Sequence, residues 1–136
     1  MSNETEKLTL NLGVVELAQI DVLVEQGIYS NRSDFIRTSI RKDLEAHSET
    51  IERQLTPIAS KKAWEKVIGI WRVDKATLEE WAAESSEKLN LSVIGMLMID
   101  KDISVELLEK TVAKVALRGK IVASDEIKAA IKKMLI

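Results

Sequence analysis

Three polar side chains near the N-terminus have the types and spacing needed to bind the edges of nucleic-acid bases. Residues 7–12 read Lys-Leu-Thr-Leu-Asn-Leu, so Lys7, Thr9 and Asn11 alternate with leucines. In the major groove of DNA, lysine donates to guanine, asparagine pairs bidentately with adenine, and threonine donates, accepts or contacts a thymine methyl group. This strict alternation predicts a strand whose polar face carries the three side chains.

Two helices are expected to follow this strand. Gly13 ends the strand, and the spacing of apolar residues over 14–26 predicts an amphipathic helix that stops before Gly27. Either Ser30 or Asn31 can cap a second helix, which is expected to fray near residues 47–53. Asp34 would lie in its first turn, where a negative charge suits the helix dipole.

A single strand leaves unpaired backbone groups along both edges. Antiparallel pairing with the same strand of a second chain would satisfy one edge of each, and would direct the leucines onto the helices. The outward polar side chains would then form a two-stranded ribbon, which fits the major groove of B-DNA. The expected dimer core consists of Leu8, Leu10, Leu12, Phe35, Ile36 and Ile40.

This order of strand, helix and helix resembles the ribbon-helix-helix family, which includes the Arc and MetJ repressors and the CopG-type regulators. The resemblance covers residues 7 to about 48 and rests on the alternating strand, Gly27 and the segment 29–37. It implies an intertwined dimer in which Lys7, Thr9 and Asn11 read bases. It also implies that the start of the second helix clamps a DNA phosphate, since free N–H groups and the positive dipole end bind such an oxygen. The residues implied at that clamp are Ser30, Asn31, Arg32 and Ser33.

The segment 31–33 also resembles nickel-responsive members of that family, whose metal domain is rich in histidine and has a cysteine ligand. This chain has one histidine, His47, and no cysteine. A copied nickel site is therefore excluded, and we expect no metal and no other cofactor. The absence of cysteine also excludes a disulfide framework and fits a reducing cytoplasm.

The rest of the chain contains an internal repeat. Residues 67–74 align with 93–100 and more weakly with 117–124, and the glycines of the three segments are 26 and 24 residues apart. Each short β-branched run precedes a polar turn and an expected helix. The expected helices are Thr77–Ser86, Ser104–Thr111 and Asp125–Leu135, with Ser104 and Ser124 as caps. Stacked copies would add parallel strands on one side and helices on the other, although glycine can recur in such segments by chance.

We therefore predict an α+β chain with two domains. Residues 1–52 would form the ribbon-helix-helix domain, and residues 53–136 a small strand-helix repeat domain with short parallel strands, serving assembly or an effector. Thr56-Pro57 is a helix-start signal near the boundary. Trp64, Trp71 and Trp81 are expected in packing, and Asp74 and Asp100 in turns.

Charge weakens the DNA-binding hypothesis. The net charge is −2, and the first fifty residues hold five basic against nine acidic side chains. Positive charge would therefore have to be local; Arg37 and Arg41 are as consistent with a solvated helix face as with phosphate contacts. No signal peptide and no membrane-spanning run is apparent, so we expect a cytoplasmic protein without a membrane partner.

The leading hypothesis is a sequence-specific regulator of transcription, a repressor that binds double-stranded DNA as a homodimer or as a tetramer joined through the C-terminal domain. A small-molecule effector cannot be named. The alternative is a protein-interaction module, such as an antitoxin or a plasmid-maintenance protein, whose C-terminal domain binds a partner; filament formation by the repeats is a third possibility. We do not expect an enzyme, because no nucleophile elbow, phosphate-binding glycine loop or histidine–carboxylate cluster is apparent.

Overall fold

The computed structural model describes residues 5–55 and 64–136. Its contacts divide the chain into two compact units, with the division between Ile51 and Glu52. The first unit is helical and the second contains the only sheet of the described residues. Thr56 and Pro57, the predicted helix start, lie outside the described residues.

The first unit contains two helices joined by a tight turn. α1 (Val14–Glu25) ends in a reversal at Gly27, whose φ is +76°. There the amide of Gly27 donates to the carbonyl of Val24, and the amide of Ile28 donates to the carbonyl of Leu23. This pair of bonds satisfies the last carbonyls of the helix and needs a residue with positive φ, which glycine adopts at little cost. The predicted end of this helix is thus confirmed.

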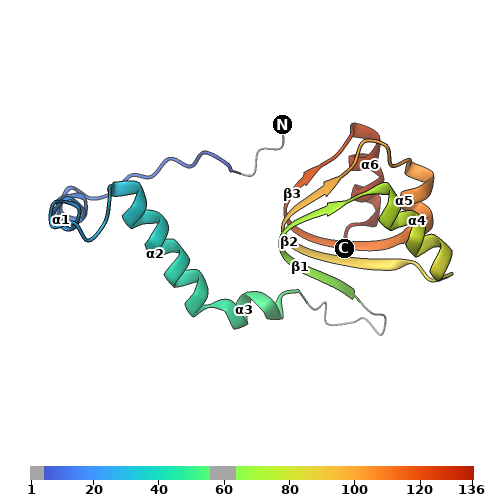
Figure 1. Ribbon diagram of the computed structural model, residues 1–136, viewed down its shortest axis with the longest axis horizontal. Helices are drawn as coiled ribbons and strands as arrows, with labels where there is room; N and C mark the ends of the chain where they lie inside the picture. The colour runs from blue at the N-terminus through green and yellow to red at the C-terminus, as the bar shows by residue number, and fades with distance from the viewer. Residues whose placement is uncertain (1–4, 56–63) are drawn as a thin grey trace. The chain divides into compact units, whose positions relative to one another are not determined.

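α2 (Arg32–Ala46) follows, and its cap is Asn31. The prediction that the second helix frays near residues 47–53 was wrong. The helix ends at Ala46 with His47 as its C-cap, and a separate short helix, α3 (Ser48–Arg53), follows (Figure 1).

Residues 7–12 do not form a strand in the single chain. The leucines and polar residues still alternate, but within the described residues nothing pairs with this segment's backbone. A strand needs hydrogen bonds to a neighbour, and the neighbour predicted for this segment is a second chain. The ribbon of the predicted fold is therefore not formed within one chain.

The second unit is a parallel sheet with a helix after each strand. Its elements are β1 (Trp64–Val73), α4 (Lys75–Glu84), β2 (Leu89–Ile99), α5 (Val105–Thr111), β3 (Val112–Val122) and α6 (Asp125–Met134). The strands lie in the order β1-β2-β3. The internal repeat is confirmed in all three copies, because residues 67, 93 and 117 are register partners.

Two details of the repeat prediction were wrong. The strands are not short, since they span 10, 11 and 11 residues and take in polar positions before each β-branched run. The first helix starts at Lys75 rather than Thr77, because Asp74 is its cap and accepts a hydrogen bond of 2.7 Å from the amide of Thr77. The predicted caps Ser104 and Ser124 are confirmed by hydrogen bonds from the amides of Leu107 and Ile127.

Glycine occupies the middle of every strand and aligns across the sheet. Gly69, Gly95 and Gly119 are register partners with φ of +130°, +137° and +134°. A Cβ on Gly95 would lie 2.1 Å from the carbonyl oxygen of Gly69, and one on Gly119 would lie 1.8 Å from that of Gly95. Close approach of the strands therefore requires glycine at both positions.

The three helices pack on one face of this sheet (Figure 1). Odd-numbered strand residues face them: Leu91, Val93, Leu97 and Ile99 of β2 belong to the buried core. Trp71 of β1 also packs against this core and contacts Trp81 of α4 edge to face. The even-numbered positions of 64–72, 90–98 and 114–122 point the other way, and we call this side the outer face of the sheet.

Candidate nucleic-acid interface

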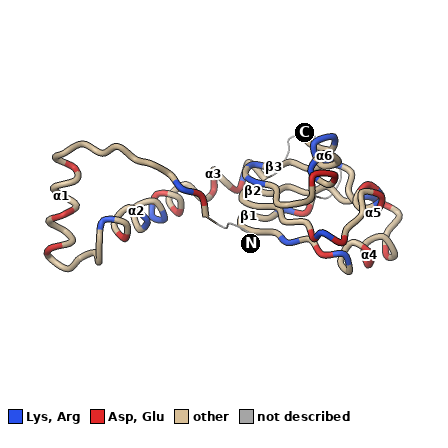
Figure 2. The backbone as a smooth tube through the Cα atoms, turned by 90° about the horizontal axis from the view of Figure 1, so that it is seen from above, with Lys and Arg blue, Asp and Glu red and all other residues tan. Residues whose placement is uncertain are grey.

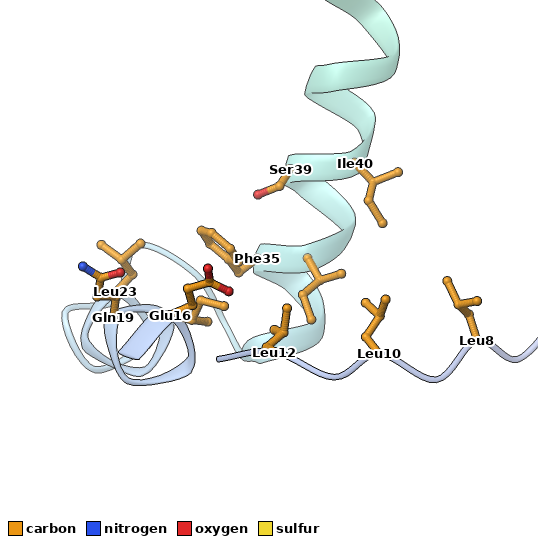
Figure 3. A pocket seen from close by; sticks show the side chains of 11 residues that line it. Leu8, Leu10, Leu12, Glu16, Gln19, Leu23, Phe35, Ser39 and Ile40 are labelled. Carbon is orange, nitrogen blue, oxygen red and sulfur yellow. The ribbon is translucent and has the colours of Figure 1, made fainter. Parts of the chain in front are cut away.

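An apolar hollow of about 610 Å³ lies in the first unit, between the extended segment and the two helices. Figure 3 shows the leucines of the segment directed toward the side chains of α2. Leu8, Leu10 and Leu12 are 77%, 52% and 40% exposed in the single chain. All six residues predicted as the dimer core line this hollow: Leu8, Leu10, Leu12, Phe35, Ile36 and Ile40.

The leucines were predicted to lie against the helices, but the residues that α1 contributes to this hollow were not predicted. Glu16, Gln19, Ile20 and Leu23 line it as well, and Ile20 is buried. Residues 16, 19, 20 and 23 fall at the three- and four-residue spacing of one helix face. That spacing is visible in the sequence and could have placed α1 beside the leucines.

Lys7, Thr9 and Asn11 lie outside the hollow. They alternate with the leucines that line it, and all three are exposed to solvent. The predicted base-reading side chains are therefore accessible.

The start of α2 is fixed by two reciprocal hydrogen bonds. The side chain of Asn31 accepts a bond of 2.8 Å from the amide of Asp34, and the carboxylate of Asp34 accepts one of 2.9 Å from the amide of Ser30. The arrangement is similar to a capping box, except that the carboxylate of Asp34 binds the amide of the residue before the cap. Two of the four predicted clamp residues, Ser30 and Asn31, thus serve the helix cap itself.

The amides of Arg32 and Ser33 open the first turn of α2. Helix geometry leaves the first N–H groups of a helix without an acceptor inside it. In the part of the chain that the structure describes, no hydrogen bond occupies these two amides. They are the groups of the predicted clamp that are available to an anion.

The guanidinium of Arg32 is engaged within the unit. It forms a bidentate ion pair with Asp21 of α1, with Nε–Oδ1 and Nη2–Oδ2 distances of 2.8 and 2.9 Å. The hydrogen bonds from Arg32 lower the pKa of the Asp21 carboxyl, and the same bonds raise the pKa of Arg32. This ion pair joins α1 to the start of α2. It also neutralises the charge of Arg32, which the resemblance assigned to the phosphate clamp.

The described residues contain neither a candidate metal-binding cluster nor a candidate membrane-spanning helix. No group of three or more His, Cys, Asp or Glu side chains in them could hold a metal ion. None of their helices has both the length and the apolar composition needed to cross a membrane.

Comparison with known proteins identifies the family. The family model of the ribbon-helix-helix transcriptional regulator family matches residues 3–128, which include the sheet unit as well as the two helices. No curated protein and no solved structure gave a match. Because the family model covers most of the 136 residues, this chain belongs to the ribbon-helix-helix transcriptional regulator family.

Proposed function

We propose that this protein is a sequence-specific DNA-binding repressor that acts as a homodimer, with a two-stranded ribbon in the major groove. The observation that carries this proposal is the apolar hollow of the first unit. Three alternating leucines lie extended and exposed there, on a backbone segment that nothing in the described residues pairs with. A second chain supplies both missing parts: a strand for the unpaired backbone and an apolar surface for the leucines.

When two such segments pair, each polar side chain has an equivalent on the second chain. Lys7, Thr9 and Asn11 of both chains then lie on the side of the ribbon that faces away from the helices, and enter the groove together. A good bidentate contact discriminates against a wrong base by about 1–3 kcal/mol. Specificity in the proposed complex comes from these contacts rather than from the net charge.

The start of α2 supplies the proposed phosphate clamp. The amides of Arg32 and Ser33 and the positive end of the helix dipole attract a phosphate oxygen. The Asp21–Arg32 ion pair holds this turn against α1. Phosphate binding is expected to fix the orientation of the ribbon on the duplex, since such contacts position a protein without reading sequence.

The sheet unit, proposed as a domain of residues 53–136, serves assembly. We expect it to join two dimers on adjacent half-sites, so that each dimer needs only modest affinity. Sedimentation of the full chain tests this part. A species no larger than the dimer at every concentration would leave the DNA-binding proposal standing and remove the tetramer.

The decisive experiment begins with selection of a binding site from a random duplex pool by the full chain. The triple variant Lys7→Ala, Thr9→Ala, Asn11→Ala is then titrated against the selected duplex at fixed salt. We expect specific binding to be lost while sedimentation still shows the dimer. Lys42→Ala, at an exposed position of α2, controls for the lost charge. Unchanged binding by the triple variant would overturn the proposed mechanism.

A further inference from the structure

The outer face of the sheet is charged with a single sign. Residues 64–136 hold twelve basic and twelve acidic side chains, so this part of the chain is neutral overall. Five of the basic residues occupy even-numbered strand positions: Lys66, Arg72, Lys114, Arg118 and Lys120. No acidic residue occupies such a position in β1, β2 or β3. The acidic residues gather elsewhere, and Figure 2 shows several of them on α4 and α5.

The basic positions are concentrated on β3. Lys114, Arg118 and Lys120 all lie on this strand and are exposed. A strand rises about 3.3 Å per residue, so the three span at most about 20 Å. Arg72 lies on β1, where it forms an ion pair of 2.9 Å with Asp100, just beyond the end of β2. The positive charge therefore follows the β3 side of the outer face.

The two edge strands of this surface are accessible, whereas Asn90, Ser92 and Met96 of the central strand are buried. A hollow of about 450 Å³ opens beside Arg118, with Ser92 and Ala116 on its sheet side and Gln54 on its rim. Ile68 and Ile70 of β1 are about half exposed, at 51% and 48%. Most parallel sheets have both faces covered. We therefore expect the exposed basic residues of this face to bind another molecule.

The sign of the charge selects that partner. Stacking two outer faces from two copies would oppose like charges, which is unfavourable. Edge pairing of β1 with a second β1 is opposed by Lys66 and Arg72, since charged residues protect an edge strand. Neither of these unfavourable interactions arises when the partner is a polyanion. Over about 20 Å of axis a DNA duplex carries about twelve phosphates, which are spaced closely enough to meet each of the three cations on β3.

We propose that the outer face of the sheet is a second DNA contact, which binds the phosphate backbone beside the site that the ribbon reads. The contact is independent of sequence, because it consists of charged side chains that meet phosphates. It rests on the proposed function in that the duplex is the one bound by the ribbon. It gives the second unit a direct part in DNA binding, in addition to assembly.

The test compares two charge-matched double variants of the full chain. Lys114→Gln with Arg118→Gln removes two charges from the outer face. Lys110→Gln with Lys133→Gln removes two from α5 and α6 on the opposite side. Both are titrated against the selected duplex extended by random flanks, and against the same site trimmed to the ribbon footprint, from about 50 to 200 mM salt.

We expect the slope of log affinity against log salt on the flanked duplex to become shallower by about 0.9 for each phosphate that the protein no longer neutralises. The outer-face variant should therefore reduce the slope by about 1.8 for each chain that touches the flanks, and the control variant should leave it almost unchanged. On the trimmed duplex the two variants should behave alike. Equal slopes for both variants on the flanked duplex would overturn this proposal and leave the ribbon mechanism intact.

The ribbon variant separates the two proposals. If Lys7→Ala, Thr9→Ala, Asn11→Ala abolishes site preference but keeps a salt-dependent binding that the outer-face variant weakens, both proposals hold. If the ribbon variant keeps site preference while the outer-face variant still has a shallower slope, only the second DNA contact survives. A wild-type chain that binds no duplex at any salt concentration would overturn both.

Discussion

Alanine at Gly95 should destabilise the sheet unit far more than alanine at Gly69. Both residues have φ near +130°, so either substitution forces an L side chain into an unfavourable backbone conformation. That strain costs about 1–3 kcal/mol, and the lower entropy of the unfolded alanine chain offsets about 0.4–1 kcal/mol of it equally in both variants. The two substitutions differ in what the new methyl group meets.

A Cβ on Gly69 meets nothing within 4 Å, because the added Cβ atoms point toward the preceding strand and β1 has no strand on that side. A Cβ on Gly95 meets the carbonyl oxygen of Gly69 at 2.1 Å, and contacts under 3.0 Å do not persist in real proteins. β1 must therefore move by about 0.9 Å relative to β2, beyond the range in which an N–H···O bond of about 2.7–3.2 Å survives. Breaking two flanking ladder bonds at about 0.5–1.5 kcal/mol each adds about 1–3 kcal/mol.

The assay is urea unfolding of the full chain, followed by tryptophan fluorescence. Trp64, Trp71 and Trp81 are the three tryptophans of the sequence, and all belong to the sheet unit, so the signal reports that unit. We expect Gly69→Ala to lower the unfolding free energy by about 1–2 kcal/mol and Gly95→Ala by about 2–5 kcal/mol. Equal losses for the two variants would refute the explanation of the glycines by close strand approach.

Three further substitutions probe the first unit. Leu10→Ala in both chains of the proposed dimer should weaken the free energy of dimerisation by about 4 kcal/mol in all, which sedimentation would show as a roughly thousandfold higher dissociation constant. Val14→Ala, at a position that is 85% exposed and outside the hollow, should leave the dimer unchanged. Asn31→Ala should lower the unfolding free energy by about 1 kcal/mol in circular dichroism melts, and Asn31→Ser should restore most of it; equal loss in both variants would argue against the side-chain cap. Because Arg32 lowers the pKa of Asp21, their pair stabilises the fold fully above the ordinary value of 3.8 and loses this effect as the pH falls through the folded pKa. Unfolding of the wild type should therefore be more acid-sensitive below about pH 4 than unfolding of Asp21→Asn, and identical acid profiles would show that the pair contributes nothing to stability.

Local patterns were enough to predict much of this structure. The reversal at Gly27, the caps Ser104 and Ser124 and the parallel repeat all follow from residue types at fixed offsets, and the structure confirms each. Six residues of the apolar hollow were predicted, three leucines from the alternation of residues 7–12 and three apolar residues from the second helix. These features depend on neighbours in sequence, or on a repeat that is visible in it.

Features that depend on distant partners were not predicted. The pairing of Arg32 with Asp21 joins residues eleven apart on two helices, and no local pattern signals it. The strand lengths were underestimated because buried polar residues such as Asn90 and Ser92 extend β2 beyond its apolar run. A single chain also cannot show the ribbon, because the hydrogen bonds that define a strand would come from the partner.

The acidic composition that weakened the DNA-binding hypothesis loses force once charges are assigned to faces. In a strand, neighbouring residues point to opposite sides, so a run such as Leu117-Arg-Gly-Lys120 places its two cations on one side and Leu117 on the core side. Net charge averages over both sides and conceals this separation. A phosphate backbone responds to the charge within about one Debye length, about 8 Å at physiological salt, and not to the total. A chain of net charge −2 can therefore gather basic side chains on one face of its sheet while many of its acidic side chains lie on α4 and α5.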